Sequence, residues 1–267
     1  MTRVINLYSG SKGNATLICA GGAKVLIDAG RSARVLAAAL TEAGVSPEEL
    51  DAIFVTHEHV DHTAALAVFS RQYRVPVHIT EPSAAILLTE PDLAACAVVH
   101  PPLYTVEIAG LRVSTFVSSH DSAACVGFRL DCADAAIGYA TDSGYVTDGM
   151  RAALTGCDTV VLECNHDPDM LRTGRYPAEL KRRIASRMGH LSNLDCAAFA
   201  AELAEAGMRR LMLAHLSPEN NTPETAYAEL CGAIGHRLCE NGGDITLAIA
   251  SAECQMTLID EGTPCCS

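Results

Sequence analysis

The stretch IFVTHEHVDH, residues 53–62, carries the strongest structural signal in this sequence. Its apolar beginning, Ile53–Val55, predicts a buried strand, and a polar loop follows directly. Three imidazoles and one carboxylate in that loop form a ligand set that suits zinc and also tolerates manganese or iron. The four potential metal ligands are His57, His59, Asp61 and His62.

The spacing within this loop allows two metal ions. Residues two apart in extended backbone share a face, so His57 and His59 can point at one ion. Asp61 and His62 can then turn toward a second ion. The alternative interpretation is a polar loop in which Asp61 caps the next helix and the histidines are only exposed. The concentration of ligand types in a single loop favours metal binding.

One loop cannot complete two metal sites, so further ligands are expected at the ends of other strands. Those strand ends would converge on the same edge of a sheet. Taken singly, a polar residue after a strand is more often a satisfied side chain than a ligand, but a set at matching strand ends favours ligation. The candidates are His120 after Leu111–Val117, Asp142 after Ala135–Tyr139 and His215 after Leu211–Ala214.

The rest of the chain alternates between predicted strands and helices. Short apolar runs indicate an antiparallel meander first, with Gly110 in a hairpin turn, and buried strands separated by helices later. This order predicts an α/β (α+β) fold of two halves packed sheet against sheet, with helices outside. We expect one domain over residues 1–267, because no linker-like composition interrupts the chain. Further predicted strands are Thr16–Cys19, Val25–Ile27, Tyr104–Ile108, Val126–Leu130 and Val160–Glu163, and the predicted helices begin after Ser32, follow His62 and span Asn193–Ala206.

Composition and charge limit the cellular compartment and the binding partners that we expect. The start of the chain lacks the apolar run of a secretion signal, and no stretch approaches the ~20 apolar residues that span a bilayer. With 12 cysteines and no CxxC pair, we expect reduced thiols in a soluble, cytoplasmic protein without a membrane partner. A formal net charge of -13 argues against coating nucleic acid by bulk electrostatics, so an anionic substrate must be held locally.

Two segments are candidates for local phosphate contacts. SGSKGN, residues 9–14, has the composition of a backbone nest that accepts phosphate, although a plain turn explains it equally well. Residues 172–187 contain six of the 19 basic residues, opposed only by Glu179, and this favours contacts with a polyanionic backbone over a merely solvated helix face. The candidate contacts are Ser9, Ser11, Asn14, Arg175, Lys181, Arg182 and Arg183.

The HxHxDH loop with a later His, Asp and His resembles the metallo-β-lactamase superfamily over most of the chain. More narrowly, eight motifs resemble the YycJ/WalJ-type branch, whose members have been linked to DNA exonuclease activity. The resemblance implies a four-layer αββα sandwich. The motifs are SGSKGN (9–14), THEHVDH (56–62), SSHD (118–121), ATDSGYV (140–146), ECNHD (163–167), RTGRYPAELKRRI (172–184), GHLSN (189–193) and LAHLSPENN (213–221).

The resemblance also implies roles for individual residues. A metal-bridging hydroxide, oriented partly by Asp61, would attack phosphorus, and His190 in GHLSN is the candidate general acid for the leaving oxygen. The alternative for GHLSN is a helix-entry loop in which Asn193 caps the next helix and His190 is polar surface. By resemblance the first metal is bound by His57, His59 and His120, the second by Asp61, His62 and His215, and both by the bridging Asp142.

These implications predict a dinuclear metal-dependent hydrolase of phosphodiester bonds. By resemblance it is a DNA exonuclease of 5′–3′ polarity, with DNA favoured over RNA as its partner and two divalent ions as cofactors, zinc or manganese, with iron also tolerated. Two alternatives stay open: a small-molecule hydrolase, such as a cyclic-nucleotide phosphodiesterase or a lactonase-like enzyme, and a non-catalytic regulatory protein on the same scaffold. The complete ligand set argues against the second. A β-lactamase is disfavoured, because such enzymes typically lack the bridging residue represented by Asp142.

Overall fold

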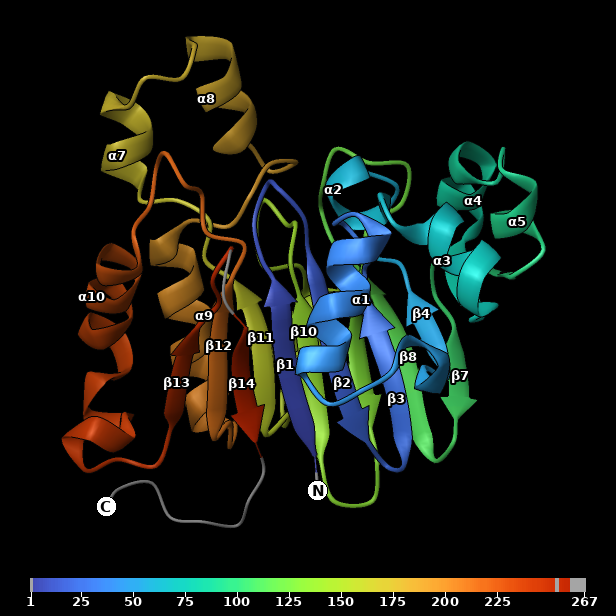
Figure 1. Cartoon of the computed structure of the whole chain (residues 1–267). Coiled ribbons are helices and arrows are strands. Elements are labelled where there is room, and N and C mark those ends of the chain that lie inside the picture. The colour runs from blue at the N-terminus through green and yellow to red at the C-terminus, as the bar shows by residue number, and fades with distance from the viewer. Residues whose placement is uncertain (1, 253–254, 260–267) are drawn as a thin grey trace.

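Two seven-stranded sheets packed face to face form the centre of the molecule (Figure 1). The structure is a computed structural model that describes residues 2–252 and 255–259. Helices cover the outer face of each sheet, so the layers follow the order helix, sheet, sheet, helix. The predicted four-layer αββα sandwich is confirmed.

The first sheet combines strands from the beginning of the chain with one strand from its far end. In spatial order the strands are β14 (Met256–Ile259), β1 (Arg3–Tyr8), β2 (Ala15–Ala20), β3 (Ala23–Ile27), β4 (Ala52–Phe54), β5 (Val77–Thr80) and β6 (Ala97–His100). Neighbouring strands from β14 to β3 are antiparallel, and those from β3 to β6 are parallel.

The second sheet has the same mixed character. In spatial order its strands are β13 (Thr246–Ile249), β12 (Arg210–Ala214), β11 (Thr159–Glu163), β10 (Ala136–Ala140), β9 (Val126–Asp131), β8 (Leu111–Val117) and β7 (Thr105–Ile108). Neighbours from β13 to β10 are parallel and those from β10 to β7 antiparallel. Strands β8, β10, β11 and β12 therefore run in one direction, and their carboxyl ends lie at the same edge of the sheet.

Helices pack on both outer faces. The first sheet is covered by α1 (Ala33–Glu42), α3 (Leu66–Tyr73), α4 (Glu81–Leu87) and α5 (Pro91–Ala94), and the second by α6 (Asp148–Leu154), α9 (Asn193–Glu205) and α10 (Pro223–Ile234). Shorter elements are α2 (Val60–Thr63), α7 (Pro168–Thr173), α8 (Ala178–Ile184) and the 3₁₀ turns η1 (Pro47–Glu49), η2 (Gly235–Arg237) and η3 (Cys239–Asn241). Within the described residues, no helix is both long and apolar enough to cross a bilayer.

Three apolar clusters hold these layers together. The cluster between the sheets includes Phe54 and Phe128, whose ring centroids are 5.7 Å apart. The other two lie beneath the helices and include Phe69 of α3 and Phe199 of α9. Burying one such side chain stabilises the fold by about 1.5–3 kcal/mol. Because the central strands are packed on both faces, their ends are held in fixed positions.

Most predicted elements lie where the sequence placed them. Gly110 forms the hairpin between β7 and β8, where Ala109 and Gly110 have φ values of 47° and 90°, as a two-residue I′ turn requires. Ser32 precedes α1 as predicted, but its side chain makes no capping hydrogen bond. Ser192, and not Asn193, caps α9. The strands that the sequence did not predict are β1, β5, β6, β13 and β14.

The turn after β3 supports the loop at residues 56–62 through its backbone. The N–H of Ala29 donates to the carbonyl of His62 at 2.7 Å. Gly30 lies so close to this loop that a Cβ built on it would stand 1.6 Å from the carbonyl oxygen of Asp61. Since no side chain fits there, the bare backbone of Gly30 determines how deeply the loop sits.

We predict that Gly30→Ala displaces this loop and lowers the free energy of unfolding by roughly 1–3 kcal/mol, because the new methyl group overlaps the carbonyl of Asp61. Urea or thermal unfolding measures the change. Gly232→Ala in α10 is the matched control, since a Cβ at that position meets nothing within 4 Å. Equal stability of the two variants would contradict the prediction.

Candidate metal centre

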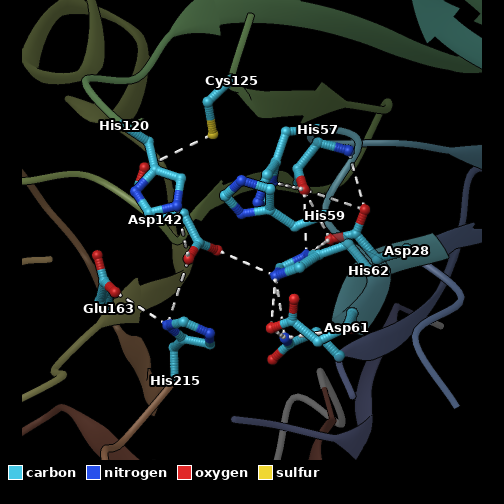
Figure 2. A network of polar contacts seen from close by, with 12 residues as sticks. Asp28, His57, His59, Asp61, His62, His120, Cys125, Asp142, Glu163 and His215 are labelled. Atoms are coloured by element: carbon cyan, nitrogen blue, oxygen red, sulfur yellow. Dashed lines mark hydrogen bonds and ion pairs between the residues drawn. The ribbon is translucent and has the colours of Figure 1, made fainter. Parts of the chain in front are cut away.

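Polar side chains from both sheets meet at one edge of the sandwich (Figure 2). The loop after β4 brings His57 and His59, and β8 ends just before His120. Asp142 follows β10 and His215 follows β12 in the same way. The potential ligand atoms lie within 4.8 Å of one another in three groups, namely His57, His59 and His120, then Asp61, His62 and His215, and then His57, His62 and Asp142.

Asp142 lies between the first two of these groups. Its Oδ2 is 3.4 Å from His62 Nε2, while its Oδ1 is 3.8 Å from His120 Nε2 and 3.5 Å from His215 Nδ1. The structure therefore brings all seven residues predicted as ligands into one cluster, with the carboxylate of Asp142 at its centre.

Backbone conformation directs several of these side chains inward. Asp28, Asp142 and His215 have φ values of 62°, 58° and 59°, in the left-handed region that L-residues rarely adopt. Each one directly or closely follows a strand, β3, β10 or β12. Such conformations cost about 1–3 kcal/mol each and persist only where the surrounding structure enforces them. Three in one cluster indicate that the chain is strained to form this site.

Three histidines of the cluster donate a hydrogen bond from Nδ1 to an oxygen atom of the protein. His62 Nδ1 donates to Asp28 Oδ2 at 2.7 Å, and His215 Nδ1 donates to Glu163 Oε1 at 3.0 Å. His120 Nδ1 donates to a backbone carbonyl at 3.0 Å. These bonds fix the proton on Nδ1 and leave the Nε2 lone pair for a cation, as is usual for histidines that bind metals.

Unpaired buried atoms show that the cluster fits divalent cations. His57 Nε2, His215 Nε2 and Asp142 Oδ2 are buried and have no hydrogen-bond partner among the described residues. An unsatisfied buried polar atom costs about 1–3 kcal/mol, which a bound cation would offset. Imidazole nitrogen combined with carboxylate oxygen is the ligand chemistry of zinc, and manganese or iron also accept it.

The charges of the cluster favour cations as well. Burial by itself lowers the pKa of His62, but the nearby Asp28 and Asp142 outweigh it and raise that pKa to about 9. Burial also lowers the pKa of His215, whereas Asp142 and Glu163 raise it to about 10. These imidazoles therefore hold protons at neutral pH while no cation is bound, and a bound cation displaces them.

His190 lies beside the cluster and outside the three ligand groups. Its Nδ1 donates to Glu163 Oε1 at 2.7 Å and lies 3.6 Å from Asp142 Oδ1. The side chain is 19% exposed and lines a cavity of about 220 Å³ that opens onto the cluster. With Asp142, Glu163 and His215, it also forms a fourth group of potential ligands within 4.8 Å. Its position is therefore compatible with a proton donor and with a further ligand.

The predicted phosphate contacts of residues 9–14 differ in their surroundings. Ser11 lines the 220 Å³ cavity. Ser9 is buried, and its hydroxyl accepts a hydrogen bond from the backbone N–H of His215 at 2.7 Å. The Asn14 amide lies 3.0 Å from an imidazole of the cluster, and its oxygen accepts a hydrogen bond from the backbone N–H of Gly10. Ser9 and Asn14 thus lie against the ligands, and Ser11 faces the cavity.

The predicted basic contacts separate onto different surfaces. Arg183 lines the cavity over the cluster, and its Nε donates to the carboxylate of Asp121. Lys181 and Arg182 line a different cavity, of about 310 Å³, between α7 and α8. Arg175 is exposed. Of these four side chains, Arg183 is the one that borders the metal-ligand cluster.

The carboxylates behind the ligands were not among the predicted site residues. Asp28 Oδ1 accepts a hydrogen bond from the backbone N–H of Thr56 at 2.8 Å, and Glu163 Oε2 accepts one from that of Ser143 at 2.8 Å. Asp28 follows β3, and Glu163 ends β11. The signal that indicated Asp142, an acidic residue at the end of an apolar strand, would have found both.

Glu58 is a further residue that the sequence did not single out. It lies between two histidines of the 56–62 loop, yet its carboxylate accepts hydrogen bonds from Ser83 Oγ at 2.9 Å and from the backbone N–H of Ala123 at 2.8 Å. It therefore ties this loop to the segment that carries His120. Its partners belong to distant parts of the chain, so no local sequence pattern predicts the contact.

A family model for a β-lactamase superfamily domain matches residues 23–216. The chain belongs to the metallo-β-lactamase superfamily. Exodeoxyribonuclease YycJ of Bacillus anthracis is 34% identical over 224 residues, which are 82% of this chain and 84% of the relative. Exodeoxyribonuclease WalJ of Streptococcus pneumoniae serotype 2 is 34% identical over 225 residues, 83% and 84% of the two chains. The crystal structure of the metallo-β-lactamase fold protein YhfI from Bacillus subtilis matches with a TM-score of 0.71 at 18% identity, covering 96% of this chain and 100% of that chain.

These findings confirm the resemblance to the YycJ/WalJ-type branch that the motifs indicated. Membership of this superfamily, together with nuclease relatives, identifies the chain as a metal-dependent hydrolase that acts on phosphodiester bonds. The superfamily implies divalent metal ions, and the cluster supplies candidate ligands for them.

We predict that Glu163→Gln weakens zinc binding about 10–100-fold, because the amide lacks the charge of the carboxylate whose Oε1 accepts bonds from His190 and His215. Competition with a chromophoric chelator measures the affinity. Glu179→Gln, on the exposed surface of α8, is the matched control. An unchanged zinc affinity would show that Glu163 does not support the ligands.

Proposed function

We propose that this chain is a dinuclear phosphodiesterase that degrades DNA from a strand end. One observation carries the proposal: the carboxylate of Asp142 lies between two groups of predicted ligands, within 3.8 Å of a histidine of each, and a cavity lined by His190 and Arg183 opens onto them. The exodeoxyribonuclease relatives, at 34% identity over most of the chain, support DNA as the substrate.

The charge of the cluster suits a phosphodiester. Asp61 and Asp142 are the anionic members of the seven-ligand set, so two divalent ions bound there would carry more charge than their own ligands neutralise. Such ions supply activated water at neutral pH and stabilise the negative charge that develops during displacement at phosphorus. An anionic substrate is thereby held locally, although the chain as a whole carries a net charge of -13.

Residues of the chain perform the proton transfers and the orientation. Glu163 holds His190 by its Nδ1, so the opposite ring nitrogen is the one available to give a proton to the leaving oxygen. Asp61 keeps 24% of its side chain exposed and lines the cavity, where its carboxylate can orient the attacking water. Arg183 adds a guanidinium at the same cavity, which suits a phosphate oxygen.

We predict that His190→Ala lowers kcat roughly 10²–10⁴-fold while the metal content per chain stays the same, because the general acid is lost and the seven ligands remain. Steady-state kinetics on a phosphodiester and elemental analysis measure the two quantities. His236→Ala removes an exposed histidine far from the cluster in sequence and serves as the control. Loss of metal in His190→Ala would assign this residue to the fourth ligand group instead.

The substrate is tested with DNA and RNA of one sequence, single- and double-stranded, labelled at either end and incubated with manganese or zinc. We expect DNA to release mononucleotides from the first time point, without internal fragments, and we expect RNA to react more slowly. Rapid release of a 5′ label would establish 5′–3′ polarity. Internal fragments would identify an endonuclease, and hydrolysis restricted to cyclic nucleotides would favour the small-molecule alternative.

A further inference from the structure

The cavity over the metal-ligand cluster has walls that hydrolysis of a phosphodiester alone does not require. It is lined by ligand residues and His190, by side chains within residues 176–184, which form one wall, and by residues 216–218, which form another. Figure 1 shows α8 standing above the edge at which the strands end. A substrate bound at the cluster therefore lies beside both segments.

Both walls present apolar side chains. Leu180 and Ile184 are four residues apart and share one face of α8, and Tyr176 precedes that helix. Leu216 and Pro218 line the cavity from the other wall. The residues of α8 include none that is buried, so this apolar surface remains partly open to solvent. Partly exposed apolar walls above a polar floor suit a ligand with a charged group at one end and a flat apolar group at the other.

The size of the cavity limits what enters it. Its volume of about 220 Å³ lies below the roughly 300–1,000 Å³ of typical small-molecule sites. One planar ring system fits such a space, and a stack of several does not. A nucleobase attached to a phosphate at the cluster has the required shape, because every base has a flat face that aromatic side chains can stack on.

We propose that this cavity is the subsite for one nucleobase next to the scissile phosphate, and that the ring of Tyr176 is its stacking platform. The inference rests on the proposed phosphodiesterase function and names the part of the substrate that α8 recognises. Stacking reads no hydrogen-bond pattern, so the subsite accepts any of the bases. Arg183, about half exposed and held by Asp121, lies at the same cavity to meet the phosphate.

The first test compares small esters on the metal-loaded protein. We expect the 4-nitrophenyl phosphodiester of thymidine, linked through its 5′ or its 3′ oxygen, to have a kcat/KM roughly tenfold or more above that of methyl 4-nitrophenyl phosphate, since only the former carries a base. Tyr176→Leu should remove most of that ratio through KM, and Tyr176→Phe should retain it. Equal kcat/KM values for all esters in the unmodified protein would overturn the subsite while leaving the phosphodiesterase intact.

The second test needs no turnover. An oligonucleotide with 2-aminopurine at its terminal position and hydrolysis-resistant phosphorothioate linkages should lose fluorescence when it binds the protein or Tyr176→Phe, and lose much less with Tyr176→Leu. The same quenching by Tyr176→Leu would overturn the proposal, whichever esters are hydrolysed. Failure of every ester together with this quenching pattern would refute the phosphodiesterase and keep the base subsite. Thermal unfolding and metal analysis of the variants show that each is folded and loaded.

Discussion

Asp28, Asp142 and Glu163 are carboxylates buried among imidazoles at the edge where the two sheets meet, and the remainder of the site depends on their staying ionised. Burial raises the pKa of Asp28 even though His62 opposes it, whereas His215 and its neighbours outweigh burial and lower the pKa of Asp142 well below its usual range. His190 in the same way brings the pKa of Glu163 down to about 2. The carboxylates in turn accept hydrogen bonds from Nδ1 of the histidines and raise the pKa values of His62 and His215. The buried acidic and imidazole groups therefore stabilise one another's charge until a cation displaces the Nε2 protons.

The sandwich supplies the rigidity that this arrangement requires. Strands packed on both faces end at fixed positions, and the left-handed conformations of Asp28, Asp142 and His215 direct their own side chains inward at a conformational cost. Gly30 permits a backbone contact that a side chain would block. The stability of the apolar layers thus offsets local strain, and the strain is concentrated where the chemistry takes place.

The segment around α8 supplies none of the seven predicted ligands and lines the cavity above them. Its basic residues point to different surfaces: Arg183 borders the cluster, whereas Lys181 and Arg182 lie at the separate cavity against α7. An acidic chain of net charge -13 can therefore present positive charge over a short distance at its site. The apolar side chains of the same segment add an apolar surface to this otherwise polar cavity. Such a combination suits a nucleotide, which carries a charged phosphate and a flat base.

The sequence by itself determined the fold class and the candidate ligands, because HxHxDH is a local pattern and His120, Asp142 and His215 each follow an apolar strand. Only the tertiary structure placed Asp28 behind His62 and Glu163 between His190 and His215. The sequence also did not predict strand β6 or the contacts of Glu58. The physical reason is that periodicity and spacing report on neighbours along the chain, whereas a buried ion pair is set by the packing of segments far apart in it.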